Sequence, residues 1–167
     1  RDVAMFATVD NGCTVSAPGF VGGVVGLTDK VLGLLDSLAK VELAVSVVVS
    51  KADIDIQEAT AITSRNFTAS ASTAATSVAS PLLAFLLAGS ASVVVSDATV
   101  DVAGSITVSE DAVIQAATEQ TVKAVASASA ISAISLSAAG NVVVSEATAH
   151  VADTAVLDVG GNLYVMA

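Results

Sequence analysis

The sequence predicts an all-β fold, a parallel β-solenoid with about two coils in each repeat of 46–49 residues. Three observations lead to this prediction. A short phrase occurs three times, its residues alternate between small apolar and polar types, and 33 Ala, 29 Val and 20 Ser make up about half of the 167 residues. Stacked coils enclose a narrow interior, which suits small and β-branched side chains better than the aromatic residues that form only 3% of this chain.

The repeated phrase begins with three valines and a serine. Its copies span 47–56, 93–102 and 142–151, at offsets of 46 and 49 residues. Successive side chains of a strand point to opposite faces. The alternation therefore places Val48 and Ser50 on an inner face and Lys51 and Asp53 on an outer face, and the other two copies keep the same parity. Each copy is predicted to be a half-buried strand.

A second phrase follows the first in each repeat. It covers 66–70, 104–109 and 160–167, and the opening residues 2–9 fit the same place in the pattern. The last strand of the chain therefore resembles its first. Because bare strand edges pair with further strands, we expect both ends to take part in assembly, through Val3, Met5, Leu163, Tyr164 and Val165.

One segment departs from the strand pattern. Val31, Leu34, Leu35 and Leu38 share one stripe at helical spacing, so an amphipathic helix is predicted over 28–40, covering the side or end of the solenoid. Residues 1–45 would then hold the first strands, a loop and this helix. The solenoid repeats would occupy 46–167, divided as 46–92, 93–141 and 142–167, and we expect one continuous domain.

Composition excludes several classes of function. With 6 basic and 16 acidic residues, the chain lacks the positive surface that binding to nucleic acid requires. The single histidine, His150, cannot build a Ser-His-Asp triad or a multi-histidine metal site, so we expect no enzyme. We expect the His150 side chain to point outward, in a column with Asp55 and Asp101. The single cysteine, Cys13, excludes a disulfide scaffold but leaves an intermolecular disulfide open.

The apolar segments do not predict a membrane span. Residues 66–96 carry no charge, but Pro81, Gly89 and alternating serines interrupt them, which favours strands over a spanning helix. The opening residues show no signal peptide, because no basic region precedes an apolar run.

Two candidate sites concern ligands and modification. Asp55, Asp97, Asp101 and Glu146 would share one outer face, where Ca²⁺ could relieve their mutual repulsion. Equivalent residues two coils apart would be separated by about 9–10 Å, too far for one ion to bridge. We therefore expect no cofactor and keep calcium as an alternative. The tripeptide at 66–68 fits an N-glycosylation acceptor at Asn66.

The third repeat carries a resemblance to a known family. Its Val142-Val143-Val144-Ser145 is followed by a polar run, then Ala155-Val156 and Gly160-Gly161-Asn162-Leu163. This order resembles the repetitive exoproteins of bacteria, the β-strand-repeat adhesins related to filamentous haemagglutinin. The first repeat departs from it, with Ser64-Arg65 where the glycine pair is expected. The resemblance implies secretion, a parallel β-solenoid and a structural or adhesive role.

The leading hypothesis is a secreted structural or adhesive β-solenoid, a subunit or segment of an extracellular filament or cell-surface rod. Its expected partners are further copies arranged head to tail, or neighbouring repeats of a longer chain. One alternative is a ligand-binding or ice-binding solenoid, which would need regular ladders of threonine. The other is a polysaccharide-acting β-helix enzyme, which would need acidic and basic residues clustered in a groove.

Overall fold

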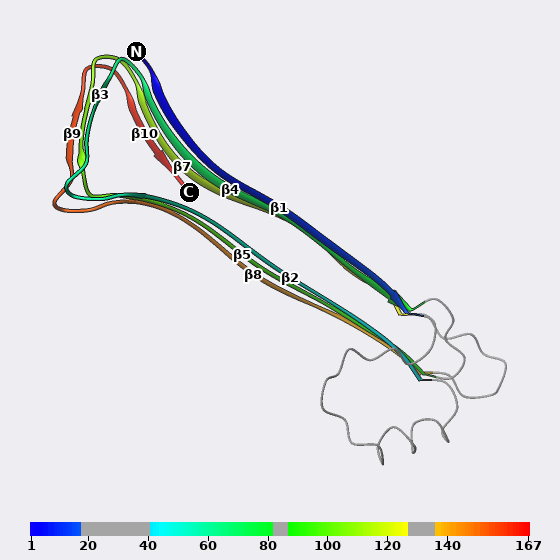
Figure 1. The fold of residues 1–167 in the computed structure, drawn as a ribbon. Coiled ribbons are helices and arrows are strands. Elements are labelled where there is room, and N and C mark those ends of the chain that lie inside the picture. The colour runs from blue at the N-terminus through cyan, green and yellow to red at the C-terminus, as the bar shows by residue number, and fades with distance from the viewer. Residues whose placement is uncertain (18–40, 82–86, 127–135) are drawn as a thin grey trace.

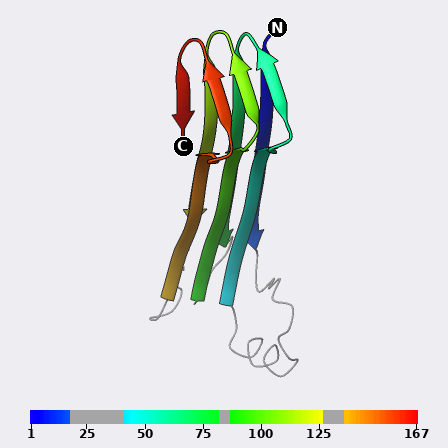
Figure 2. The same ribbon diagram turned by 90° about the vertical axis from the view of Figure 1, so that its left-hand side faces the viewer.

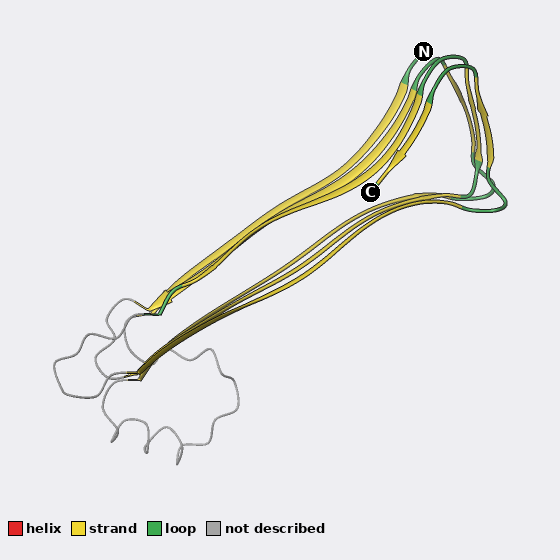
Figure 3. Ribbon diagram, turned by 180° about the vertical axis from the view of Figure 1, so that it is seen from behind, coloured by secondary structure: helices red, strands yellow, loops and turns green. Residues whose placement is uncertain are grey.

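The computed structural model describes residues 1–17, 41–81, 87–126 and 136–167, which form strands and turns and contain no helix (Figure 3). Val, Ile, Thr, Ser and Ala alternate along the strands, and β-branched residues favour this extended conformation. The strands are β1 (Val3–Ala17), β2 (Val41–Ile56), β3 (Ala61–Ser64), β4 (Phe67–Pro81), β5 (Leu87–Val102), β6 (Ser105–Val108), β7 (Ala112–Ala124), β8 (Leu136–Val151), β9 (Val156–Val159) and β10 (Leu163–Met166).

The strands form three parallel sheets. Sheet A has the order β1-β4-β7-β10, sheet B the order β2-β5-β8 and sheet C the order β3-β6-β9. The chain visits sheets A, B and C in turn and then returns to sheet A one strand further along (Figures 1 and 2). Sheets A and B are two long walls, and sheet C is a short third side (Figure 1).

The three copies of the repeated phrase are immediate neighbours in sheet B. Val48 pairs with Val94, and Val94 pairs with Val143. The expected two coils per repeat are therefore wrong, because one repeat supplies only one strand to each sheet. The reason is strand length. The strands of sheet B have 16 residues each, so two long strands and one short strand use up a whole repeat.

Only part of the second phrase lies in the sheet position that the sequence predicts. Val3, Phe67 and Leu163 do occupy equivalent positions in sheet A, as the likeness of the two ends predicts. Residues 105–108, however, form β6 in sheet C, and the equivalent strand of sheet A is β7, which begins at Ala112. The predicted helix at 28–40 lies outside the described residues.

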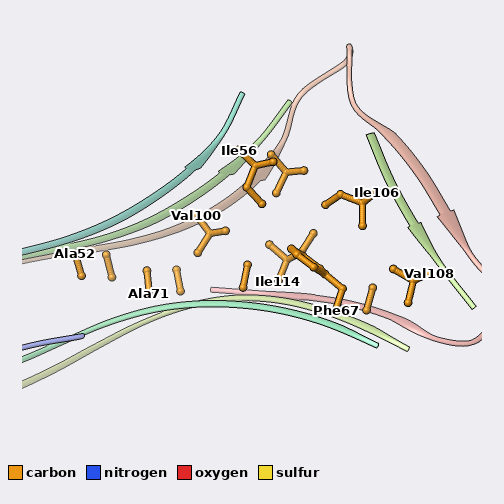
Figure 4. Close-up of a cluster of buried hydrophobic side chains, with 13 residues drawn as sticks. Ala52, Ile56, Phe67, Ala71, Val100, Ile106, Val108 and Ile114 are labelled. Atoms are coloured by element: carbon orange, nitrogen blue, oxygen red, sulfur yellow. The ribbon is translucent and has the colours of Figure 1, made fainter. Parts of the chain in front are cut away.

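The core is a wedge that narrows along the two long walls. Its wide part, next to sheet C, holds Phe67, Ile106 and Ile114 (Figure 4). Alanines line the narrower part, for example Ala71 and Ala98 (both 0% exposed). The inner face predicted for the first two copies of the phrase is confirmed, since their even-numbered residues from 48 to 52 and from 94 to 102 are buried.

The described part of the uncharged stretch 66–96 belongs to β4 and β5. Within the described ranges, no helix has the length and apolar character needed to cross a membrane.

Candidate functional site

The charged residues of the repeated phrase gather on the outer face of sheet B. Nζ of Lys51 lies 3.2 Å from a carboxylate oxygen of Asp53 on the same strand and 3.4 Å from one of Asp97 on the next strand. Hydrogen bonds to Asp53 and then to Asp97 raise the pKa of Lys51. Glu146 occupies the third position of this column, beside Asp97, and has no cation partner among the described residues.

A second column on the same face holds Asp55, Asp101 and His150 in adjacent strands, as the sequence predicts. Nδ1 of His150 lies 2.6 Å from Oδ1 of Asp101, a hydrogen bond that becomes an ion pair when the imidazole is protonated. Asp55 is the neighbour of Asp101 on the other side, in β2.

The four calcium candidates are closer than expected. Because each repeat is one strand, Asp55 neighbours Asp101 and Asp97 neighbours Glu146, at the spacing of adjacent strands, about 4.8 Å. The separation of about 9–10 Å inferred from two coils is therefore incorrect. Within the described residues, no group of three or more His, Cys, Asp or Glu side chains is arranged to hold a metal ion.

At the corner that leads into sheet A, aspartate and asparagine alternate from strand to strand. Asn66 Nδ2 donates to Asp2 Oδ1 over 3.2 Å, and Asn66 Oδ1 accepts from the backbone N–H of Asp111 over 3.2 Å. Asn162 donates to Asp111 Oδ1 from its backbone N–H at 2.8 Å and from Nδ2 at 3.1 Å. The amide of Asn66, the predicted glycosylation acceptor, is thus part of a ladder that binds successive strands together.

Arg65 adds charge to this corner ladder. Its Nη2 lies 3.1 Å from Asp2 Oδ2, its Nε donates to Asp2 Oδ1 over 3.2 Å, and Nε is 3.8 Å from Glu110 Oε2. The hydrogen bond from Arg65, followed by that from Asn66, lowers the pKa of Asp2. Sequence reasoning missed the ladder, although the recurring Asp or Asn before each strand was a usable signal.

A row of serine hydroxyls crosses the narrow part of the core between sheets A and B. Ser46 Oγ donates to the carbonyl of Cys13 over 3.1 Å, Ser77 Oγ donates to Ser46 Oγ over 2.8 Å, and Ser92 Oγ donates to Ser77 Oγ over 2.5 Å. The thiol of Cys13 is free and partly buried. These bonds satisfy polar groups that would otherwise be costly inside the wedge.

The exposed face of sheet B also carries a valine patch that sequence reasoning missed. Val47 and Val49 are 56% and 64% exposed, and Val142 and Val144 are both 55% exposed. Three consecutive valines on a strand must place at least one outward, so the Val-Val-Val run itself was the signal.

The predicted assembly strands lie at opposite edges of sheet A. Val3 and Met5 belong to β1 and pack against the core, whereas Leu163, Tyr164 and Val165 belong to β10, at the other edge. β10 pairs with residues 112–115 of β7, and the described residues place no strand other than β4 beside β7 from Ala116 to Ala124. The inner face of β8 is exposed opposite this part of β7, at Val143 and Ser145.

Comparison with protein-family models, with curated proteins and with solved structures finds no match for this chain.

Proposed function

We propose that this protein is a secreted structural or adhesive β-solenoid, a subunit or segment of an extracellular filament or cell-surface rod. One observation carries the proposal. The three copies of the repeated phrase pair in parallel and in register, from Val48 through Val94 to Val143. Each repeat adds one strand to each of three sheets, and such an arrangement can lengthen along one axis by simple addition.

The contacts between strands support a structural role. The ladder from Asp2 to Asn162 links successive strands at the corner, and the buried serine row links sheets A and B. The net charge of −10 keeps the exposed surface hydrated.

The experiment concerns the location and shape of the native protein. Antibodies against the described strands should label intact cells that produce the protein, and external protease should remove the label while a cytosolic marker stays protected. Labelling only after permeabilisation would overturn the extracellular location. Electron microscopy of the released protein should show rods with a long cross-section of about 50 Å, the length of 16 extended residues. Round particles would contradict the proposed rod shape.

A further inference from the structure

We propose that the outer face of sheet B is an interaction surface for a second copy of this chain, which packs on it face to face with its strands running in the opposite direction. The inference goes beyond the proposed function, because a rod does not require contact between two molecules. It concerns the face of one long wall (Figure 1) and not its edges, since further strands beside β2 or β8 would extend this face and would not cover it.

The first half of this face carries no polar side chain. Because β2, β5 and β8 pair in register, their outward residues form rows across the sheet. Four successive rows make up a set of twelve residues that we call the apolar face: Leu43, Gly89 and Ala138; Val45, Ala91 and Gly140; Val47, Val93 and Val142; Val49, Val95 and Val144. The valines of β2 and β8 in this set are between 44% and 64% exposed.

The apolar face has the size of surfaces that bind a partner. One outward residue of a sheet covers about 6.6 Å along the strand and about 4.8 Å across it, so the twelve residues cover about 380 Å². The largest apolar patch of a monomer measures about 300–600 Å² and often has a function. Stable interfaces bury about 800 Å² on each partner, so we expect a weak and reversible dimer.

The relief of the apolar face is complementary to itself. The valine rows are ridges, whereas on β5 and β8 the two rows before them hold only glycine and alanine. A Cβ added to Gly140 would meet no atom within 4 Å. A two-fold axis that crosses the strands at the level of Ser92 places Val93 over Ala91 of the second copy. The same axis places Val142 over Gly140 of the second copy. Large residues thus face small ones, which is how side chains fill the space between packed sheets.

A second copy is the partner that this relief fits. The ridges run straight across three strands at a spacing of about 6.6 Å, because the strands pair without offset. A partner must carry ridges of the same spacing and direction to interdigitate along their whole length, as identical paired sheets do. Sheet B of a second copy carries them. On β2 the facing residues are valine and leucine, so the two sheets approach most closely along β5 and β8.

Charge decides the orientation of the second copy. The rows that follow the apolar face are charged, and Lys51 lies between Asp53 and Asp97. If the two sheets ran in the same direction about an axis along β5, Asp97 would face Asp97 of the second copy. Asp101 would likewise face its own counterpart, and such like-charge contacts are destabilising. With the strands running in opposite directions, the charged rows lie outside the apolar contact at its two ends.

The first test changes one residue in the middle of the apolar face. Sedimentation equilibrium of the full chain should show a reversible equilibrium between monomer and dimer. Val93→Thr keeps the β-branched shape and should weaken the dimer about tenfold or more, because two hydroxyls replace two buried methyl groups in each dimer. Val113→Thr, on the outer face of sheet A, is the matched control and should leave the equilibrium unchanged.

Two results of this test would overturn the inference. One is a full chain that stays monomeric at every soluble concentration, and the other is an equal loss of dimer in both variants. Circular dichroism verifies that the variants keep their β-structure. The proposed function would stand in either case, because cell-surface labelling and electron microscopy test it separately.

The second test separates a specific fit from general apolar adhesion. Gly140→Leu makes the face more apolar but fills the space over which Val142 of the second copy packs. It should weaken the dimer about fivefold or more, as overpacking does. Gly12→Leu, at an equally open glycine on the outer face of sheet A, is the control and should leave the dimer unchanged. A dimer strengthened by Gly140→Leu would overturn the assigned packing.

The third test measures the orientation. In a chain with Cys13→Ser, a spin label at Thr99→Cys lies seven residues from the axis at Ser92. The two labels of a dimer should therefore be about 45–50 Å apart in pulsed electron paramagnetic resonance. Sheets running in the same direction would place them about 10 Å apart, the spacing of packed sheets, and this result would overturn the proposed orientation.

Discussion

At the scale of single residues, alternation decides which side chains enter the core. Val100 is 0% exposed and belongs to the main core cluster, whereas its neighbour Asp101 faces outward and contacts His150. The two residues are adjacent in the sequence, but one side chain lies in the core and the other lies on the outer face of the sheet. Their substitution therefore reports directly on the face assignment.

Val100→Asp should destabilise the protein by about 4 kcal/mol or more, because an unpaired carboxylate would enter an apolar stack. Asp101→Val should change the free energy of unfolding by about 1 kcal/mol or less, since it removes only an exposed pair. Thermal or denaturant unfolding measures both effects. Equal or reversed effects would contradict the face assignment.

Buried hydroxyls offer a second comparison between matched residues. Ser77 both donates and accepts in the serine row, whereas Ser96 is equally buried but its Oγ has no hydrogen-bond partner among the described residues. Ser77→Ala should cost about 1 kcal/mol of unfolding free energy, and Ser96→Ala should be neutral or stabilising. Denaturant unfolding of both variants separates the two cases. A larger loss for Ser96→Ala would show that its hydroxyl has a partner in solution.

The corner ladder predicts a dependence of stability on pH. The pKa of Asp2 is lowered in the folded chain by the hydrogen bonds from Arg65 and Asn66. Its contribution to stability is therefore present above the unfolded value of 3.8 and is lost as the pH falls through the lower folded value. Asp2→Asn should reduce stability at pH 6, and the difference from the parent should vanish in strong acid. Asp10→Asn, within β1 and outside the ladder, is the control. A difference for Asp2→Asn that persists or grows in acid would contradict the assignment.

At the scale of elements, the corners determine how closely the strands stack. A Cβ added to Gly104 would lie 2.6 Å from the carbonyl oxygen of Thr60 and 2.8 Å from that of Gln57. Both are backbone atoms of the preceding corner, so they cannot rotate away. The glycine is thus needed for close approach between corners, whereas Gly140 in β8 has open space around it.

Gly104→Ala should destabilise the protein by about 2 kcal/mol, within the range of overpacked sites. Gly140→Ala should have little effect or a small stabilising one, because it removes only the flexibility of the unfolded chain. Unfolding curves of the two variants decide between the outcomes. Similar stabilities would mean that the corner can shift without cost.

At the scale of the whole molecule, strand pairing is almost entirely between residues far apart in sequence. Each residue of β5, for example, pairs with β2 and β8, at separations of 46 and 49 residues. Such topologies fold slowly, because each pairing closes a long loop first. The described residues are strands and turns throughout, so the signal of the whole chain should be dominated by β-structure.

Circular dichroism of the intact chain should therefore show a β-dominated spectrum, with a minor helical contribution from the segment 28–40 if the sequence-based prediction holds there. A mainly helical spectrum would contradict the parallel sheets. Infrared spectroscopy in the amide I region gives an independent measurement of the same property.

The sequence by itself determined the parallel strands, their inner and outer faces and the likeness of the first strand to the last. These features follow from a period of two and from repetition, and both are local patterns. Only the tertiary structure decided that a repeat is one circuit rather than two coils, because glycine does not mark strand ends consistently: Gly104 lies at a corner after β5, whereas Gly89 and Gly140 lie inside β5 and β8. It also decided the ladder from Asp2 to Asn162 and the outward valines. These depend on which strands become neighbours, a property of distant pairing that a local pattern does not contain.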